Sequence, residues 1–452
     1  MRSNPFIYTI SIIGAIFVGW ALFNPDFNGT MEYLLMLIFF IIVAWTLLLA
    51  FVPHRRERRY IMTVFFLALL LRMLVSSVVH NFLPPGYFAP DEPGTLINGW
   101  ANAQYWLGNN GAPGAAGSIY TITGIVFYIF GYKPNILFLL ANFLGALTVI
   151  NVYFITKRLF NTQAARYSFI AVAVLPSLAL WSSMPLKDVY TQFFITSILH
   201  LTLRTKERFS LSVVVMIIGL IALVGFVRIY LMIIVMVAIA VTFIPVNPET
   251  FMRNTIVIAI FATTFTLFFS SYTIQSAAVY GHTSEGAFQT LQQTRQGFYT
   301  GGSKILGHIN IGNPLNALMY SPLLLAVFFL APFPWDITSS IIHNLATMES
   351  LIWYYLLYYA IKAIIRTFKE GNFDILPLLV MIIILSVAYA LAISNIGAAY
   401  RFRGQVSVLL LVFTGYGFYL RKQEHLKKYS SSHASTEKRD VGSSLSPLTR
   451  GT

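Results

Sequence analysis

Two adjacent carboxylates, Asp91 and Glu92, lie in a turn rich in Pro and Gly, a few residues after an apolar run long enough to cross a bilayer. Acid pairs are uncommon so close to a membrane, and ionisable residues there usually serve a function. A carboxylate near an acceptor can take the proton of an attacking hydroxyl group. The simpler alternative is that both acids belong to an ordinary solvated loop. After the turn, helical spacing predicts one helix face, made of Leu96, Trp100, Ala103 and Trp106.

Cationic side chains form the second group of candidates. Arg binds phosphate oxygens through a planar fork, and Lys acts as a compact point charge, so acids and cations together suit a reaction on an anionic lipid headgroup. Each cation also has a structural interpretation, because Arg and Lys at span ends often extend toward the headgroups. Asp188 could simply cap the helix that follows it. The candidate substrate-binding residues are Arg72, Lys187, Asp188, Arg228, Tyr230, Tyr400, Arg401 and Arg403.

The composition excludes an ordinary soluble protein, because 57% of the 452 residues are hydrophobic and only 10% are charged. Several apolar runs of about eighteen or more residues predict an all-α polytopic membrane protein. The net charge of +14 does not indicate nucleic acid as a partner, since the basic residues sit mainly between spans and in the C-terminal segment, as the positive-inside bias produces. The absence of Cys excludes disulfides, thiolate metal sites and Cys nucleophiles.

Run length and the Lys/Arg bias predict about twelve transmembrane helices, with both termini in the cytoplasm. The basic cluster in 53–59 marks the cytoplasmic end of the second span. The third span, about 60–79, therefore runs outward and delivers Asp91 and Glu92 to the extracytoplasmic face. Two apolar runs, 119–130 and 315–330, are too short to cross comfortably, and we expect interfacial or re-entrant helices on the outer face.

The expected organisation is one transmembrane domain, 1–420, with its core at about 60–420 and a disordered basic cytoplasmic tail at 421–452. Large outer loops are expected at about 80–135 and 271–349. Pro176 should kink the span at about 165–182. Arg72 lies about 18 Å along its own span, at 1.5 Å per residue, and needs a partner or a route to the outer headgroups. The other candidates fall on the outer membrane face.

Four stretches, taken in order, resemble a known group of proteins. The acidic pair in the first large outer loop looks like the acidic motif of the GT-C superfamily of membrane glycosyltransferases. The nearest group is the family 39-like bacterial enzymes, which are related to protein mannosyltransferases and aminoarabinose transferases. Residues 136–160 (ILFLLANFLGALTVINVYFITKRLF) are similar to that family's second span with its terminal basic pair. Residues 175–194 and Tyr400-Arg-Phe-Arg403 resemble later spans and the Arg-rich outer turn.

The resemblance covers roughly residues 60–230 well and the C-terminal part loosely. The chain departs from the family pattern at Pro93, directly after the acids, and at Gly404-Gln405, where the family's turn runs into Leu-Pro.

The resemblance implies transfer of a sugar from a polyprenyl-phosphate donor to a hydroxyl of a lipid, glycan or protein acceptor. Transfer would occur on the outer face of a prokaryotic inner or plasma membrane, with inversion at the anomeric carbon. Asp91 would be the general base, and Glu92 or Asp188 would orient it or bind sugar hydroxyls. A phosphate leaves as a stable anion, so it needs cations more than a general acid. The cations assigned to this role are Lys187, Arg228, Arg401, Arg403 and Arg72.

Three alternatives stay open. Two or three carboxylates could hold Mg²⁺ or Mn²⁺ against a phosphate, but the cations already neutralise a monophosphate, so we expect no cofactor. A polysaccharide polymerase or ligase would use a lipid-diphosphate donor and would depend on Arg in the largest outer loop, such as Arg295. A flippase or transporter of lipid-linked sugars would place charges near mid-membrane and show two similar halves. We see no clear internal repeat.

Overall fold

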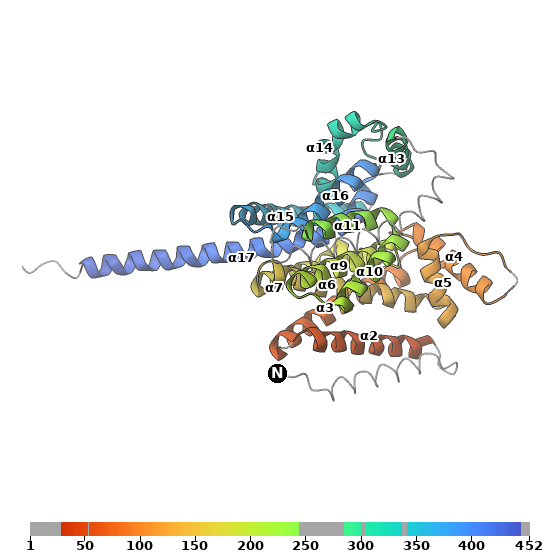
Figure 1. The fold of residues 1–452 in the computed structure, drawn as a ribbon, viewed down its shortest axis with the longest axis horizontal. Helices are drawn as coiled ribbons and strands as arrows, with labels where there is room; N and C mark the ends of the chain where they lie inside the picture. Colours follow the sequence, from red (N-terminus) through yellow and green to blue (C-terminus); the bar gives the residue numbers. More distant parts are fainter. Residues whose placement is uncertain are drawn as a thin grey trace, which may run out of the picture.

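The computed structural model describes residues 29–52, 54–109, 111–243, 284–299, 303–336 and 341–443. Every regular element in these ranges is a helix, apart from one isolated antiparallel bridge between Lys304 and Asn395, and this confirms the all-α class (Figure 1). The expected first and ninth spans, about 6–23 and 254–271, lie outside the described residues.

Four helical segments among the described residues are long and apolar enough to cross a membrane. They are α3 (Arg55–Phe82), α6 (Pro134–Leu159), the segment Phe373–Ala392 that contains α16 (Leu376–Ala392), and residues 396–427 of α17 (Ile396–Ser443). Other apolar helices are shorter, so the count of about twelve spans stays a prediction. The remaining helices are α2 (Gly29–Phe51), α4 (Asp91–Trp106), α5 (Ser118–Phe130), α7 (Thr162–Val174), α8 (Pro176–Trp181), α9 (Lys187–Glu207), α10 (Leu211–Val227), α11 (Ile229–Thr242), α13 (Ser284–Phe298), α14 (Pro314–Leu330) and α15 (Ile341–Lys369).

The core of the bundle is built around α6, which packs against α3, α7 and α9 (Figure 1). Apolar residues on all sides of α6 are buried, as expected for a helix surrounded by other helices. On the other side of α7, α17 packs against both α7 and α15. α17 then projects from the bundle and continues to Ser443, so the chain is helical at 421, where we expected the disordered tail to begin.

The helix break at Pro176 provides the hydrogen-bond partners that Arg72 was expected to need. α7 ends at Val174 and α8 begins at Pro176, while Leu175 between them is extended, as the residue before proline favours. This confirms the expected kink as a full interruption. Proline has no N–H, so the carbonyls of the preceding turn lose partners. The Arg72 guanidinium donates to the carbonyls of Ala173 and Val172 at 3.3 and 3.5 Å, and it is fully buried there.

The acidic pair lies in the first turn of α4 and not in a turn before it, which corrects the sequence-based expectation. Negative charge is favourable at a helix N-terminus, so both acids suit this position. The buried face also differs from the apolar face predicted for this segment. Trp100 and Trp106 of the predicted face meet α5, where their rings lie 6.2 Å from the Phe127 ring and 6.4 Å from the Tyr128 ring, but Trp106 remains 42% exposed. The buried residues of α4 are Glu92, Thr95, Gly99, Asn102 and Ala103.

The two short apolar runs form α5 and α14, with 13 and 17 residues. Both are shorter than the roughly 20 residues that a perpendicular span needs, and their re-entrant or interfacial placement stays a prediction. α5 forms a helical hairpin with α4 beside the main bundle (Figure 1). The hairpin carries Asp91 at its start, so it positions the candidate base.

Replacement of Gly415 by Ala should destabilise the bundle. A Cβ atom at this position would lie 2.0 Å from the Ser168 Oγ and 2.5 Å from the Ala164 carbonyl oxygen, so α17 and α7 would have to separate. We expect a loss of about 1–3 kcal/mol in the free energy of unfolding, measured by thermal unfolding in detergent. Gly219→Ala is the matched control, because a Cβ there meets no atom within 4 Å. Equal melting temperatures for both variants would contradict this packing.

Candidate functional site

The Asp188 carboxylate, at the start of α9, joins three distant parts of the chain. Its Oδ2 accepts a hydrogen bond from the Arg401 Nε at 2.6 Å, and its Oδ1 accepts one from the Arg228 guanidinium at 2.8 Å. The Gln405 amide also donates to Oδ1 at 2.8 Å. Asp188 is fully buried, so these bonds replace its hydration. Asp188 therefore does more than cap α9, which is the role that its sequence position suggested, because it anchors both guanidinium groups.

The charges of this cluster stabilise one another. Burial alone would raise the pKa of the Asp188 carboxyl, but the Arg401 and Arg228 guanidinium groups outweigh burial and hold that pKa below its ordinary value. Burial alone would lower the pKa of Arg228, but Asp188 raises it above its ordinary value. The acid and the base are therefore both ionised at neutral pH.

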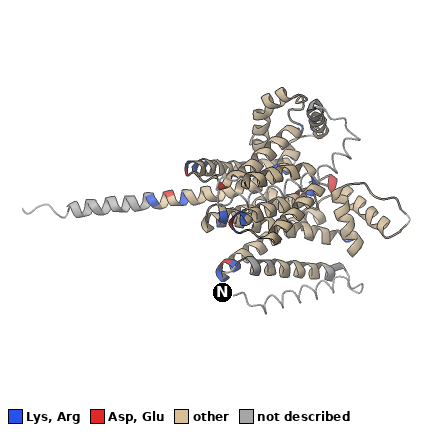
Figure 2. Cartoon of the chain, in the orientation of Figure 1, with Lys and Arg blue, Asp and Glu red and all other residues tan. Residues whose placement is uncertain are grey.

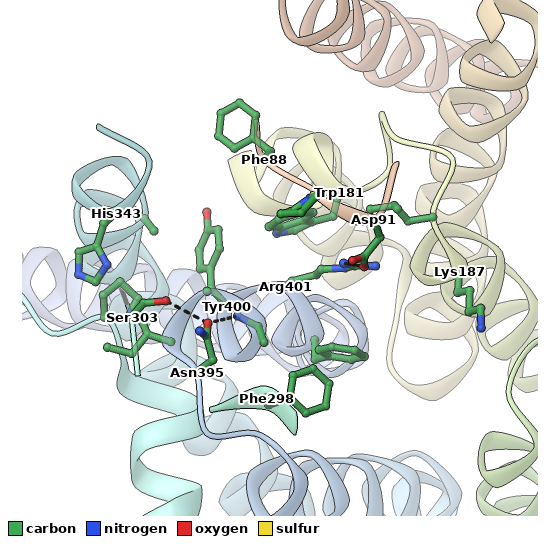
Figure 3. A pocket seen from close by; sticks show the side chains of 18 of the residues that line it. Phe88, Asp91, Trp181, Lys187, Phe298, Ser303, His343, Asn395, Tyr400 and Arg401 are labelled. Atoms are coloured by element: carbon green, nitrogen blue, oxygen red, sulfur yellow. Dashed lines mark hydrogen bonds and ion pairs between the residues drawn. The ribbon is translucent and has the colours of Figure 1, made fainter. Parts of the chain in front are cut away.

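Asp91 lies on the open side of this cluster. Its Oδ2 accepts a hydrogen bond of 3.0 Å from the Arg401 Nη1, and Figure 3 shows the two side chains next to each other. The Asp91 side chain is 69% exposed, in contrast to the buried Asp188. One guanidinium group therefore bridges a buried structural carboxylate and an accessible carboxylate.

A cavity of about 1200 Å³ opens beside Asp91. It includes cationic, acidic and aromatic side chains from α4, α9, α17 and the link between α10 and α11 (Figure 3). Arg401 also lies 5.7 Å from the centre of the Trp181 ring, where the ring face attracts its charge. The expected site residues that line this cavity are Asp91, Lys187, Arg228, Tyr400 and Arg401.

Lys187 is the half-buried cation of this wall. Burial, and next the neighbouring Arg228 charge, lower the pKa of its ammonium group, while Asp188 and Asp91 partly oppose this effect. Lys187 therefore adds positive charge to the cavity, and it loses that charge more readily than an exposed lysine would.

Two expected phosphate ligands do not line the cavity. Arg72 bonds to backbone carbonyls at the α7–α8 break and to the Ser182 hydroxyl at 2.8 Å. Arg403 donates to the carbonyls of Phe329 and Ala331, at 2.9 and 2.8 Å, and so satisfies the C-terminus of α14. Both side chains are buried. Their hydrogen bonds stabilise the helices around the cavity.

The remaining expected residues are Glu92 and Tyr230, which do not line the cavity, and Tyr400, which does. Glu92 is buried and pairs with the His80 Nε2 at 2.6 Å. The Tyr230 hydroxyl accepts a hydrogen bond from Arg228 at 2.8 Å. Tyr400 lines the cavity but donates its hydroxyl proton to Glu349 at 2.5 Å. These contacts hold the three side chains in fixed orientations.

Several lining residues were not predicted as site residues. Asp336 and Lys304 lie in segments that we expected to be outer loop, and their sequence surroundings carry no motif. Asp336 accepts a hydrogen bond from the Phe333 backbone N–H at 2.9 Å, which fixes the turn after α14. Their expected position on the outer face was the one sequence signal that could have identified them as candidate site residues.

Within the described ranges, no three His, Asp or Glu side chains converge in a group that could hold a metal ion. Both Asp188 oxygens accept hydrogen bonds from Arg or Gln, and Glu92 is paired with His80. Asp91 is the accessible carboxylate of the acidic pair. Independence from metal stays an expectation.

No family model matches this chain, and no curated protein matches its sequence. Its fold is similar to that of the oligosaccharyltransferase AglB of Archaeoglobus fulgidus in complex with an inhibitory peptide and a dolichol-phosphate, with 14% identity and a TM-score of 0.50. That alignment covers 88% of this chain and 53% of the archaeal chain. The apo form of the same enzyme aligns with 15% identity over 82% of this chain and 52% of that chain, with a TM-score of 0.47.

The chain thus spans about half the length of the archaeal protein. At this identity the likeness shows the fold alone, so membership of the GT-C superfamily stays a prediction. The family 39 subtype stays a prediction.

Replacement of Asp188 by Asn should be strongly destabilising, because it leaves the buried Arg228 and Arg401 charges without their carboxylate. We expect a loss of about 3–5 kcal/mol in the free energy of unfolding. In the wild type the same stabilisation should be lost only as the pH falls through the lowered pKa of Asp188. Asp374→Asn, which breaks the exposed pair with Lys206, is the control and should change little. Similar unfolding of both variants would show that Asp188 is not the anchor.

Proposed function

We propose that the protein is an inverting glycosyltransferase that moves a sugar from a polyprenyl-phosphate donor to an acceptor hydroxyl. The observation that carries this proposal is the shared cavity of Asp91, Lys187, Arg228 and Arg401. These four residues provide an accessible carboxylate and three cationic groups, which are the groups that this reaction needs.

The donor phosphate would bind where Lys187, Arg228 and Arg401 converge. Guanidinium groups bind two phosphate oxygens at once, and the lysine adds a point charge. As the bond between the anomeric carbon and the phosphate oxygen breaks, the oxygen gains negative charge, which these fixed cations stabilise. Asp188 orients the two guanidinium groups in advance, so little rearrangement is needed during the reaction.

Asp91 would act as the general base. The acceptor oxygen forms its bond to the anomeric carbon from the face opposite the leaving phosphate, and its proton passes to Asp91. Because Arg401 bonds to Asp91 and faces the phosphate site, it sets the spacing between base and leaving group. Such alignment of the reacting atoms is worth several kcal/mol of the barrier.

Some expected roles change with this arrangement. Arg72 and Arg403 would support the site by holding helix ends in place, because their guanidinium groups are already bonded to carbonyls. Glu92 would orient α4 through His80, and Tyr230 and Tyr400 would fix Arg228 and α17.

The partners proposed are the bilayer, a polyprenyl-phosphate sugar, and a lipid, glycan or protein acceptor. The archaeal enzyme with a similar fold was solved with a dolichol-phosphate and an inhibitory peptide, which supports a lipid-linked donor and adds weight to a peptide acceptor. We place the cavity on the extracytoplasmic face of a prokaryotic inner or plasma membrane, with both termini in the cytoplasm and no nucleic acid as a partner.

The polymerase or ligase alternative depended on Arg295 as a donor ligand. Arg295 is buried, and its guanidinium donates to the carbonyls of Ile393 and Leu306 at 2.9 Å. These bonds secure the chain between α13 and α16. The Arg295 guanidinium is therefore occupied by backbone carbonyls and is not placed to bind a donor. For this reason the geometry favours the transferase.

Replacement of Asp91 by Asn should lower the rate of sugar transfer by about 10²–10⁴-fold, because the amide cannot accept the acceptor proton. The assay follows release of free polyprenyl phosphate from a panel of lipid-phosphate sugars in purified membranes. Asp336→Asn is the control, since Asp336 is the other acid lining the cavity. Loss of transfer in the Asp336 variant alone would move the base from Asp91 to Asp336.

The Michaelis constant for the donor should rise with pH as Lys187 loses its proton. The pKa of Lys187 is lowered by burial, so this loss should begin at a lower pH than for an exposed lysine. Lys187→Arg keeps the positive charge at high pH and should remove the alkaline rise. Lys304→Arg, at another cavity-lining lysine, should leave the pH profile unchanged. A profile unaffected by Lys187→Arg would remove Lys187 from donor binding.

A further inference from the structure

Two neighbouring cavities lie away from the candidate active site and share Phe154 and His200 in their walls. One is polar, has a volume of about 510 Å³ and is lined by the C-terminal parts of α6 and α9. The other is apolar, has a volume of about 430 Å³ and lies between α2, α6, α9 and α10. Because they share these two residues, the cavities lie side by side as a polar half and an apolar half, which together are called the double cavity.

The double cavity lies at the opposite end of the bundle from Asp91. α9 begins at Lys187, beside the active-site cavity, and ends at Glu207, which lines the polar cavity. A helix of 21 residues is roughly 30 Å long, which is about the thickness of the hydrocarbon core. Figure 2 shows Lys and Arg gathered at the end from which α17 projects. Clustered Lys and Arg side chains favour contact with anionic lipid headgroups, and the polar cavity is itself lined by such side chains.

The polar cavity has an excess of positive charge. Its one lining acid is Glu207, which pairs with Arg158. Lys157 pairs with Glu57, which lies outside the cavity lining. Even with both acids counted, the basic groups are in excess, so the site attracts an anion. The basic lining residues are Lys157, Arg158, Arg204 and Arg208.

Two buried polar atoms of residues that line the polar cavity make no hydrogen bond within the described part of the chain. They are the Nδ1 of His200 and the Nε of Arg158. His200 is only 7% exposed and lines both cavities, so its ring lies where the polar half meets the apolar half. Buried polar atoms normally have partners. A ligand with polar atoms at this level would supply them.

We infer that this double cavity binds an anionic phospholipid, with its phosphate among the basic side chains and one acyl chain in the apolar groove. A free phosphate would satisfy only the polar half, and a neutral lipid would not complement the net positive charge of that half. The groove has room for a chain, because a Cβ at Gly219 in its wall would meet no atom within 4 Å. The site is independent of the sugar-transfer proposal.

Native mass spectrometry of the full-length protein in detergent tests the headgroup half, with titration of phosphatidylglycerol, phosphatidylcholine or inorganic phosphate. Arg204→Gln/Arg208→Gln should weaken phosphatidylglycerol binding by roughly thirtyfold, at about 1 kcal/mol for each of the two basic residues. The control Arg55→Gln/Arg56→Gln removes the same charge from exposed positions at the same end of the bundle and should bind as the wild type does. Equal binding of the two phospholipids, or equal weakening in both double variants, would overturn the proposal.

Gly219→Leu tests the apolar half, because the new side chain fills the groove and leaves every charge in place. We expect it to weaken phosphatidylglycerol binding severalfold. Gly297→Leu is the matched control, at an exposed helical glycine in α13 with equally open surroundings. Two results would refute the lipid assignment and leave a simple anion site. One is unchanged lipid binding in Gly219→Leu. The other is an affinity for inorganic phosphate equal to the affinity for phosphatidylglycerol.

Discussion

The contact of one buried carboxylate with two guanidinium groups organises the site. A charge as buried as Asp188 is stable only when opposite charges and hydrogen bonds replace its hydration. Arg228 and Arg401 supply these from the link between α10 and α11 and from α17. The same contact turns the second side of the Arg401 guanidinium toward Asp91. One electrostatic constraint thus fixes the proposed base and the phosphate-binding cations relative to each other.

The arginines show how one residue type serves two purposes in an apolar bundle. Where water is absent, every backbone carbonyl needs a donor, and helix breaks leave carbonyls without one. Arg72, Arg295 and Arg403 donate to such carbonyls at the α7–α8 break, after α16 and after α14. Arg228 and Arg401 instead bond to a carboxylate and keep part of their surface toward the cavity. The difference lies in the partner that packing brings to each side chain.

α9 connects the two sites of interest because its length is close to the thickness of a bilayer core. Lys187 at its first turn lines the candidate active-site cavity, while Arg204 at its last turn lines the basic half of the double cavity. Cationic side chains therefore line a cavity at each of its ends. Its middle is buried against α6 and α10.

The sequence by itself determined the all-α class, the candidate base and the cations at one end of the spans, because hydropathy and charge bias are local properties of the chain. It also located the break at Pro176, since proline acts on its own backbone. Only the tertiary structure decided that Asp188 anchors the site and that Arg403 caps α14. Arg401 and Asp188 are 213 positions apart, and contacts of that range depend on how helices pack rather than on any local pattern.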